Sequence, residues 1–113
     1  MKRDAADVRA IFESVPGLAG KVVYRVWKAD EEQAVPDMPY LAFYPPRSVS
    51  FFADNVTYHL RDHYTAELYS VAVLPALESG VEAALTAAGI AFSKTKDFIE
   101  AQNCWAVTYD FEV

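Results

Sequence analysis

The first stretch of helical spacing lies near the start of the chain. Residues 4–14 repeat apolar side chains every three to four positions, which predicts an amphipathic helix. Asp4 is placed to cap it, and the Pro16-Gly17 pair is placed to end it. The buried face of this helix is expected to carry Val8, Ile11 and Phe12.

A second helix is predicted over residues 75–88. Pro75 suits a helix first turn, and Gly89 suits the residue that follows a helix end. Gly80 inside this helix costs about 1 kcal/mol relative to alanine, so either it lets another backbone approach closely or the helix is locally weak. The apolar face is expected to contain Leu77, Val81, Ala84, Leu85 and Ala88.

Between and after the helices, the period changes to two, which is typical of strands. In residues 63–70, for example, Tyr64, Ala66 and Leu68 alternate with more polar neighbours. Residues 56–62 fit either an extension of that strand or a separate edge piece. Strands are predicted over residues 21–28, 40–44, 49–53, 63–70, 90–96 and 103–112.

The order of elements is helix, four strands, helix, two strands. Successive strands joined by short turns pair in antiparallel fashion, and two short helices suffice to cover one face. The sequence therefore predicts an α+β fold, with one antiparallel, or mixed, sheet of about five to six strands and two helices on one face. A single domain over residues 1–113 is expected.

Composition narrows the classes of function. The chain has 113 residues, 53% of them hydrophobic, and a formal charge of −6, which argues against electrostatic binding of nucleic acid. One cysteine, Cys104, excludes an internal disulfide framework and fits a reducing compartment. No signal peptide and no membrane-spanning run is recognisable, so we expect a soluble protein made inside the cell.

Residues that invite a catalytic or metal-binding interpretation are few. His59 and His63 would lie about 13 Å apart in a strand, too far for one ion. Cys104 sits in a predicted strand, where a thiol packed as a small apolar group is the ordinary role. Neighbouring acids occur in pairs, but they fall in a solvated loop (Glu31, Glu32) and on the polar face of the last strand (Asp110, Glu112). We therefore expect no enzyme activity, no metal and no cofactor.

Aromatic side chains are more informative, because they are too many to share one small core. Phe51 and Phe52 are adjacent in a strand and must point to opposite sides, so one of them leaves the principal core. Such exposed aromatic residues commonly mark interfaces. The candidate interface consists of Phe51, Phe52, Asp54, Asn55 and Tyr58, the two polar residues forming a turn signal.

Several segments resemble one protein family. They are the strand Leu41–Tyr44, the run Phe-Ala-Asp-Asn-Val-Thr-Tyr at 52–58, the Glu-Leu-Tyr strand at 67–69, the Gly-Ile-Ala-Phe segment at 89–92 and the closing Val-Thr-Tyr-Asp-Phe-Glu-Val at 107–113. Together they resemble small proteins encoded in the morphogenesis modules of long-tailed phages and prophages of mainly Gram-positive bacteria. The resemblance runs from about Tyr24 onward, and the run at 52–58 is its most specific part.

This resemblance implies a tail terminator or tail-completion protein. Such a protein forms a ring, of six subunits in this family, that caps the tail tube and offers a docking surface for the head. The implied partners are further copies of the chain, the major tail tube protein and the head–tail connector or stopper proteins. The implied location is the tail or neck of the virion, assembled in the bacterial cytoplasm, with no catalytic residues.

An acidic segment suggests a further role in such a ring. Residues 29–38 carry four acids and no base, and the connection is longer than most between strands. Glu31, Glu32 and Asp37 are candidates for facing the lumen or the tube, where they would repel DNA phosphate.

Two alternatives stay open at this point. Another head–tail neck protein, a stopper or adaptor, would share the ring and differ in its partner. A small intracellular ligand-binding domain would instead show a pocket lined by Tyr64, Tyr69 and a histidine.

Overall fold

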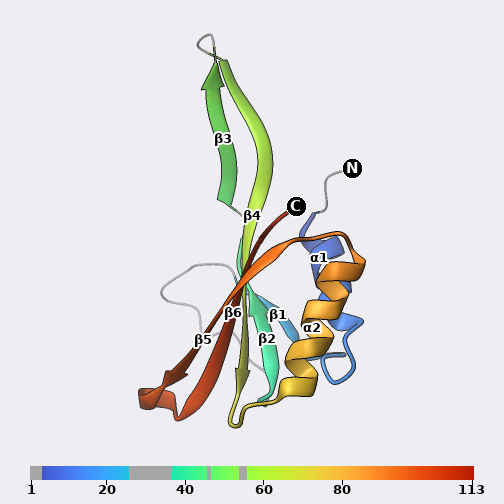
Figure 1. The fold of residues 1–113 in the computed structure, drawn as a ribbon, viewed down its shortest axis with the longest axis vertical. Coiled ribbons are helices and arrows are strands. Elements are labelled where there is room, and N and C mark those ends of the chain that lie inside the picture. Colours follow the sequence, from blue (N-terminus) through green and yellow to red (C-terminus); the bar gives the residue numbers. More distant parts are fainter. Residues whose placement is uncertain (1–3, 26–36, 46, 54–55) are drawn as a thin grey trace.

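The computed structural model describes residues 4–25, 37–45, 47–53 and 56–113, and for residues 47–53 and 56–61 it describes the backbone alone. The predicted α+β fold is confirmed (Figure 1). Its elements are α1 (Ala5–Glu13), β1 (Val22–Tyr24), β2 (Tyr40–Phe43), β3 (Arg47–Ala53), β4 (Val56–Ser70), α2 (Pro75–Ala87), β5 (Phe92–Ile99), a 3₁₀ turn (Glu100–Gln102) and β6 (Cys104–Glu112).

Both helices begin and end where the capping residues predict. At the start of α1, the Asp7 amide donates to the Asp4 carboxylate at 2.9 Å, and the Asp4 amide donates to the Asp7 carboxylate at 3.1 Å. Two otherwise unpaired amides are satisfied in this way. At the other helix, Pro75 occupies the first turn of α2, and Gly89 follows its end with a φ of 75°.

Gly80 is explained by close packing between the two helical segments. A Cβ at this position would lie 2.9 Å from Cγ1 of Val15, in the turn after α1. Val15 is itself buried, with 2% of its surface exposed, so it has no room to move aside. The missing side chain lets α2 approach the turn that ends α1.

The sheet has six strands, ordered β1-β2-β4-β6-β5, with β3 paired to β4 off this path. All pairs are antiparallel except β1 with β2, which run parallel. The sheet is therefore mixed, and the expectation of an antiparallel or mixed sheet is confirmed. The connection from Arg25 to Pro39 is long enough for the chain to return and run in the same direction.

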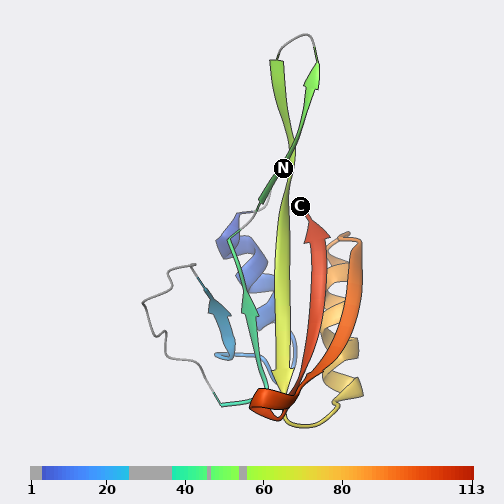
Figure 2. The same cartoon turned by 90° about the vertical axis from the view of Figure 1, so that its left-hand side faces the viewer.

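Helices α1 and α2 lie together on one face of the sheet, as predicted (Figures 1 and 2). The hydrophobic core lies between these helices and the sheet. The ring of Phe12 on α1 packs against the rings of Phe43 and Phe111, at centroid distances of 6.1 and 5.8 Å. Val8 and Phe12 are buried and Ile11 packs at the margin, which confirms the predicted face of α1.

Several strand limits differ from the predicted ones. The predicted strand 21–28 is only Val22–Tyr24 within the described residues, and residues 26–28 fall outside them. Residues 56–62 extend β4 and form no separate piece, so the strand predicted over 63–70 has 15 residues. β3 begins at Arg47 and β5 runs on to Ile99, because both continue to pair with a neighbouring strand.

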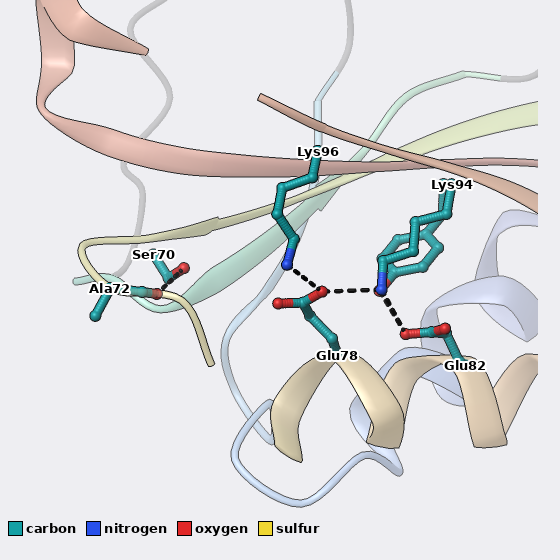
Figure 3. Close-up of polar contacts among 7 residues, drawn as sticks. Ser70, Ala72, Glu78, Glu82, Lys94 and Lys96 are labelled. Atoms are coloured by element: carbon teal, nitrogen blue, oxygen red, sulfur yellow. Dashed lines mark hydrogen bonds and ion pairs between the residues drawn. The ribbon is translucent and has the colours of Figure 1, made fainter. Parts of the chain in front are cut away.

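A cluster of ion pairs ties β5 to α2 (Figure 3). The carboxylate of Glu78 lies 2.9 Å from Nζ of Lys94 and 3.0 Å from Nζ of Lys96. The Glu78 side chain is only 6% exposed. Burial would raise the pKa of Glu78, but hydrogen bonds and charge attraction from Lys94 and Lys96 outweigh it and hold that pKa below its usual value.

Candidate functional site

The most conspicuous feature outside the core is a projecting two-stranded ribbon, here called the arm (residues 47–53 and 56–61). It consists of β3 and the first part of β4, and it extends away from the helices and from the rest of the sheet (Figures 1 and 2). The molecule is consequently 50 Å long and 23 Å across its shortest axis.

The arm forms because β2 and β3 pair in turn with the same edge of β4. β2 pairs with Ala66–Tyr69, and β3 pairs with residues 56–63. Pro45 lies between β2 and β3, and a proline has no amide hydrogen to donate to the hydrogen-bond ladder of a sheet. It therefore marks the break between the arm and the rest of the described chain, here called the body. The register shifts between Val49 and Ser50, which leaves Leu60 of β4 as an extra, unpaired residue in the ladder.

The predicted interface residues fall on this arm. Phe51 pairs across the ribbon with Tyr58, and Phe52 pairs with Thr57, which places the aromatic residues of the prediction near the outer end. Asp54 and Asn55 lie outside the described residues. Phe51, Phe52 and Tyr58 thus lie on neighbouring positions of a projecting ribbon that was not predicted, and their role as an interface stays a prediction.

The acidic segment is only partly described. Glu31 and Glu32 lie outside the described residues. Asp37 is exposed, and its backbone carbonyl accepts a hydrogen bond from Nζ of Lys21. The structure therefore places one of the three predicted acids at the surface.

The sheet face opposite the helices, here called the open face, carries a tyrosine cluster that the sequence analysis missed. The rings of Tyr40 and Tyr69 lie 5.2 Å apart, and the Tyr69 hydroxyl donates to the carboxylate of Glu67. Burial raises the pKa of Tyr69, and the hydrogen bond to Glu67 raises it further. Burial also raises the pKa of Tyr40 and Tyr44.

The pocket expected for a ligand-binding domain is not formed by the residues named for it. Tyr64 faces the helices and stacks on Phe111 at 5.8 Å, with 1% of its surface exposed. Tyr69, five positions further along β4, lies on the open face. Strand geometry sends residues an odd number apart to opposite sides, so the two tyrosines line different surfaces.

Where β4 leaves the body, a small polar cluster lies on the open face. Nε2 of His63 lies 3.2 Å from Oδ1 of Asp110, and the Thr65 hydroxyl donates to the same oxygen at 2.8 Å. His63 and Asp110 also line a shallow hollow of about 430 Å³ beside the start of β5. Within the described ranges, no group of three or more His, Cys, Asp or Glu side chains is placed to hold a metal ion.

Cys104 lies in β6 with 1% of its surface exposed. Its Sγ atom is 3.9 Å from the side-chain oxygen of Gln102. Such a thiol packs as a small apolar group, in line with the ordinary role expected from the sequence.

Comparison with known proteins adds no identification, since no protein-family model matches the chain and no curated protein matches it. Neither helix in the described part of the chain has the length and apolar character that crossing a membrane requires.

Proposed function

We propose that this protein is a tail terminator of a long-tailed phage or prophage, a ring-forming subunit that caps the tail tube and joins it to the head. The proposal starts from the resemblance of the sequence, whose most specific part is the run at 52–58. Its described residues, Phe52, Ala53 and Val56–Tyr58, lie in the outer part of the arm. The main support for the proposal is therefore that the most specific part of the resemblance falls in the projecting arm.

A projecting ribbon suits a subunit that assembles. An isolated two-stranded hairpin is marginally stable in water, because it buries little apolar surface. This one has Phe51, Phe52 and Tyr58 in its sequence, and aromatic residues of this kind are enriched at protein interfaces. A ring needs one patch of each subunit to meet a different patch of the next, and an arm at one end of the molecule meets this requirement.

In the proposed role, the protein acts by binding and not by catalysis. Its partners are further copies of itself, six to a ring by the resemblance, together with the tail tube protein and the connector proteins of the neck. The proposed location is the neck of the virion after assembly in the bacterial cytoplasm. The acids Glu31, Glu32 and Asp37 are then candidates for the lumen or the tube contact.

The test is electron microscopy of particles made by the parent phage or induced prophage after deletion of this gene. A terminator is needed to stop tube growth, so we expect overlong tubes together with DNA-filled heads that carry no tail. Tails of normal length joined to heads would refute the proposal.

Two further strains make this test specific. Supplying the intact gene from a plasmid should restore tails of normal length, which excludes an effect of the deletion on neighbouring genes. Tails of normal length that fail to join heads would indicate the other neck role, that of a stopper or adaptor.

A further inference from the structure

The strand β5 forms one outer edge of the sheet, and this edge is long and regular. β5 pairs with β6 without a register shift from Phe92 to Ile99, over eight residues. Among the described strands, none pairs with its outer side. Alternate amide and carbonyl groups along that side are therefore open to another strand.

Proteins usually protect such an edge with prolines, bulges, short strands or lysine side chains that lie across it. β5 has neither a proline nor a bulge. Its two lysines, Lys94 and Lys96, are drawn toward α2 by their ion pairs with Glu78, so they are held on the helix side (Figure 3). The opposite edge differs, since within the described residues β1 spans only Val22–Tyr24. Among the described strands, the longer exposed edge is therefore that of β5.

The arm offers an edge that matches β5. In the described chain, β6 runs beside β4 only as far as the pairing of Asp62 with Val113, so the outer side of residues 56–61 has no partner strand. Along residues 56–59 the pairing with β3 runs without a shift, and Leu60 is the extra residue where the register changes between Val49 and Ser50. The arm also extends beyond the end of the sheet, away from the β5 of its own subunit (Figures 1 and 2).

Charge favours docking of the arm on the body of another copy. The arm segment 47–61 contains two arginines, Arg47 and Arg61, and one acid, Asp54, whereas the whole chain has a formal charge of −6. The strands β5 and β6 contribute Asp97, Asp110 and Glu112 to the open face beside the free edge. An arm with a net positive charge is therefore attracted to this side of the sheet, next to the β5 edge.

We propose that the outer edge of β5 receives the arm of a second copy of this chain, with residues 56–61 of β4 adding as a further strand. This inference rests on the proposed function for the identity of the occupant, and it deepens that function by naming the contact between neighbouring subunits. Main-chain hydrogen bonds supply affinity in such strand addition. Because the donating arm and the accepting edge are different surfaces, the contact can repeat from subunit to subunit, as a ring requires.

The test is site-directed cross-linking with single cysteines, Thr57→Cys on the arm and Thr95→Cys on β5. The native Cys104 is 1% exposed, so it stays in place and the unsubstituted protein serves as its control. Mixing the two variants with a short bis-maleimide is expected to yield a cross-linked pair, several-fold more than either variant alone. A protein with both substitutions is expected to give a ladder of higher oligomers.

The matched control replaces Thr95→Cys with Ala10→Cys, an exposed position on α1 far from the β5 edge. The proposed pairing is wrong if Ala10→Cys cross-links to Thr57→Cys with the same yield as Thr95→Cys. It is also wrong if neither variant cross-links to Thr57→Cys. Cross-linking uses no tail tube or head, so this result is independent of the deletion phenotype. The strand pairing can therefore fail while the terminator role stands, and the reverse also holds.

A second measurement concerns a shortened arm, in which Phe51–Tyr58 is replaced by Asn-Gly so that Ser50 and His59, paired across the ribbon, are joined by a tight turn. Native mass spectrometry is expected to show oligomers for the intact protein and only monomer for this variant. Oligomers that persist without the arm would overturn the inference.

Discussion

The strand β4 passes through two different environments, and the contrast between its halves explains how the molecule is organised. Its second half, from His63 to Ser70, lies between β2 and β6. There, Tyr64, Ala66 and Leu68 are each at most 1% exposed beneath the helices. Its first half, from Val56 to Arg61, pairs with β3 and belongs to the arm.

One continuous strand therefore belongs to two parts of the molecule. The second half is held on both edges and on one face, so its apolar residues contribute to the folding of the single chain. The first half pairs with β3 on one edge, and the proposed function assigns it to assembly. The comparison predicts that changes in the body alter the free energy of unfolding, whereas changes in the arm alter association.

The largest expected effect on stability comes from removing a core ring beneath the second half. Phe12→Ala is expected to lower the free energy of unfolding by about 3–5 kcal/mol, since Phe12 is fully buried between Phe43 and Phe111. Urea unfolding followed by circular dichroism measures this loss. The matched control is Phe98→Ala, whose ring is 44% exposed and for which we expect a loss of less than about 1 kcal/mol. Equal losses for the two variants would contradict the assigned core.

The next effect concerns the ion pairs that anchor β5. Glu78→Gln is expected to cost about 2 kcal/mol near neutral pH, because a buried carboxylate with two lysine partners is replaced by a neutral amide. The pKa of Glu78 is lowered in the folded protein, so its stabilising effect is present above its usual value of 4.5. That effect is lost as the pH falls through the lower, folded value. The difference in melting temperature between the intact protein and the variant should therefore shrink on acidification below pH 4.5.

A neighbouring acid provides the control for this prediction. Glu82 lies 3.1 Å from Nζ of Lys94, but its side chain is 31% exposed. Glu82→Gln is therefore expected to cost less than about 1 kcal/mol, since partly exposed ion pairs are screened by solvent. A loss as large as that for Glu78→Gln would show that burial is not what makes the Glu78 contacts important.

A smaller effect on the free energy of unfolding is expected at the contact between α2 and the turn after α1. The sign of this effect should depend on the residue at position 15. Gly80→Ala gains about 1 kcal/mol in helix propensity, but the new Cβ would lie 2.9 Å from Val15, and such overpacking typically costs about 1–3 kcal/mol. We expect a net loss of about 1 kcal/mol. In a Val15→Ala background the same substitution should instead stabilise the protein. A double-mutant cycle by chemical denaturation measures this coupling, and additive effects would contradict it.

Some of the features behind these predictions could be predicted from the sequence, and others could not. Local signals were reliable: Asp4 and Pro75 marked the helix starts, and the alternation of Tyr64, Ala66 and Leu68 marked the buried face of β4. Each of these depends on neighbours within a few positions along the chain. They were therefore sufficient for the α+β class and for most elements.

Partner choice between strands was less predictable. The parallel pairing of β1 with β2 depends on the path of a long connection, and no local pattern encodes that path. Residues 56–62 alternate much as residues 63–70 do, so nothing in their sequence shows that β6 stops beside Asp62. For this reason the candidate interface was predicted by its aromatic residues but not as an arm, and the open edge of β5 was not predicted at all.

The smallest expected effect on stability comes from the arm itself. Replacing Phe51–Tyr58 by Asn-Gly removes a stretch whose described residues pair with one another across the ribbon, and every buried core residue stays in place. The free energy of unfolding of the monomer should change by less than about 0.5 kcal/mol, since shortening a surface connection has only a small entropic effect. Unfolding must be measured at a concentration where the intact protein is monomeric, because association adds to apparent stability. A loss comparable to that of Phe12→Ala would show that the arm supports the body, and β4 would then be one structural unit and not two.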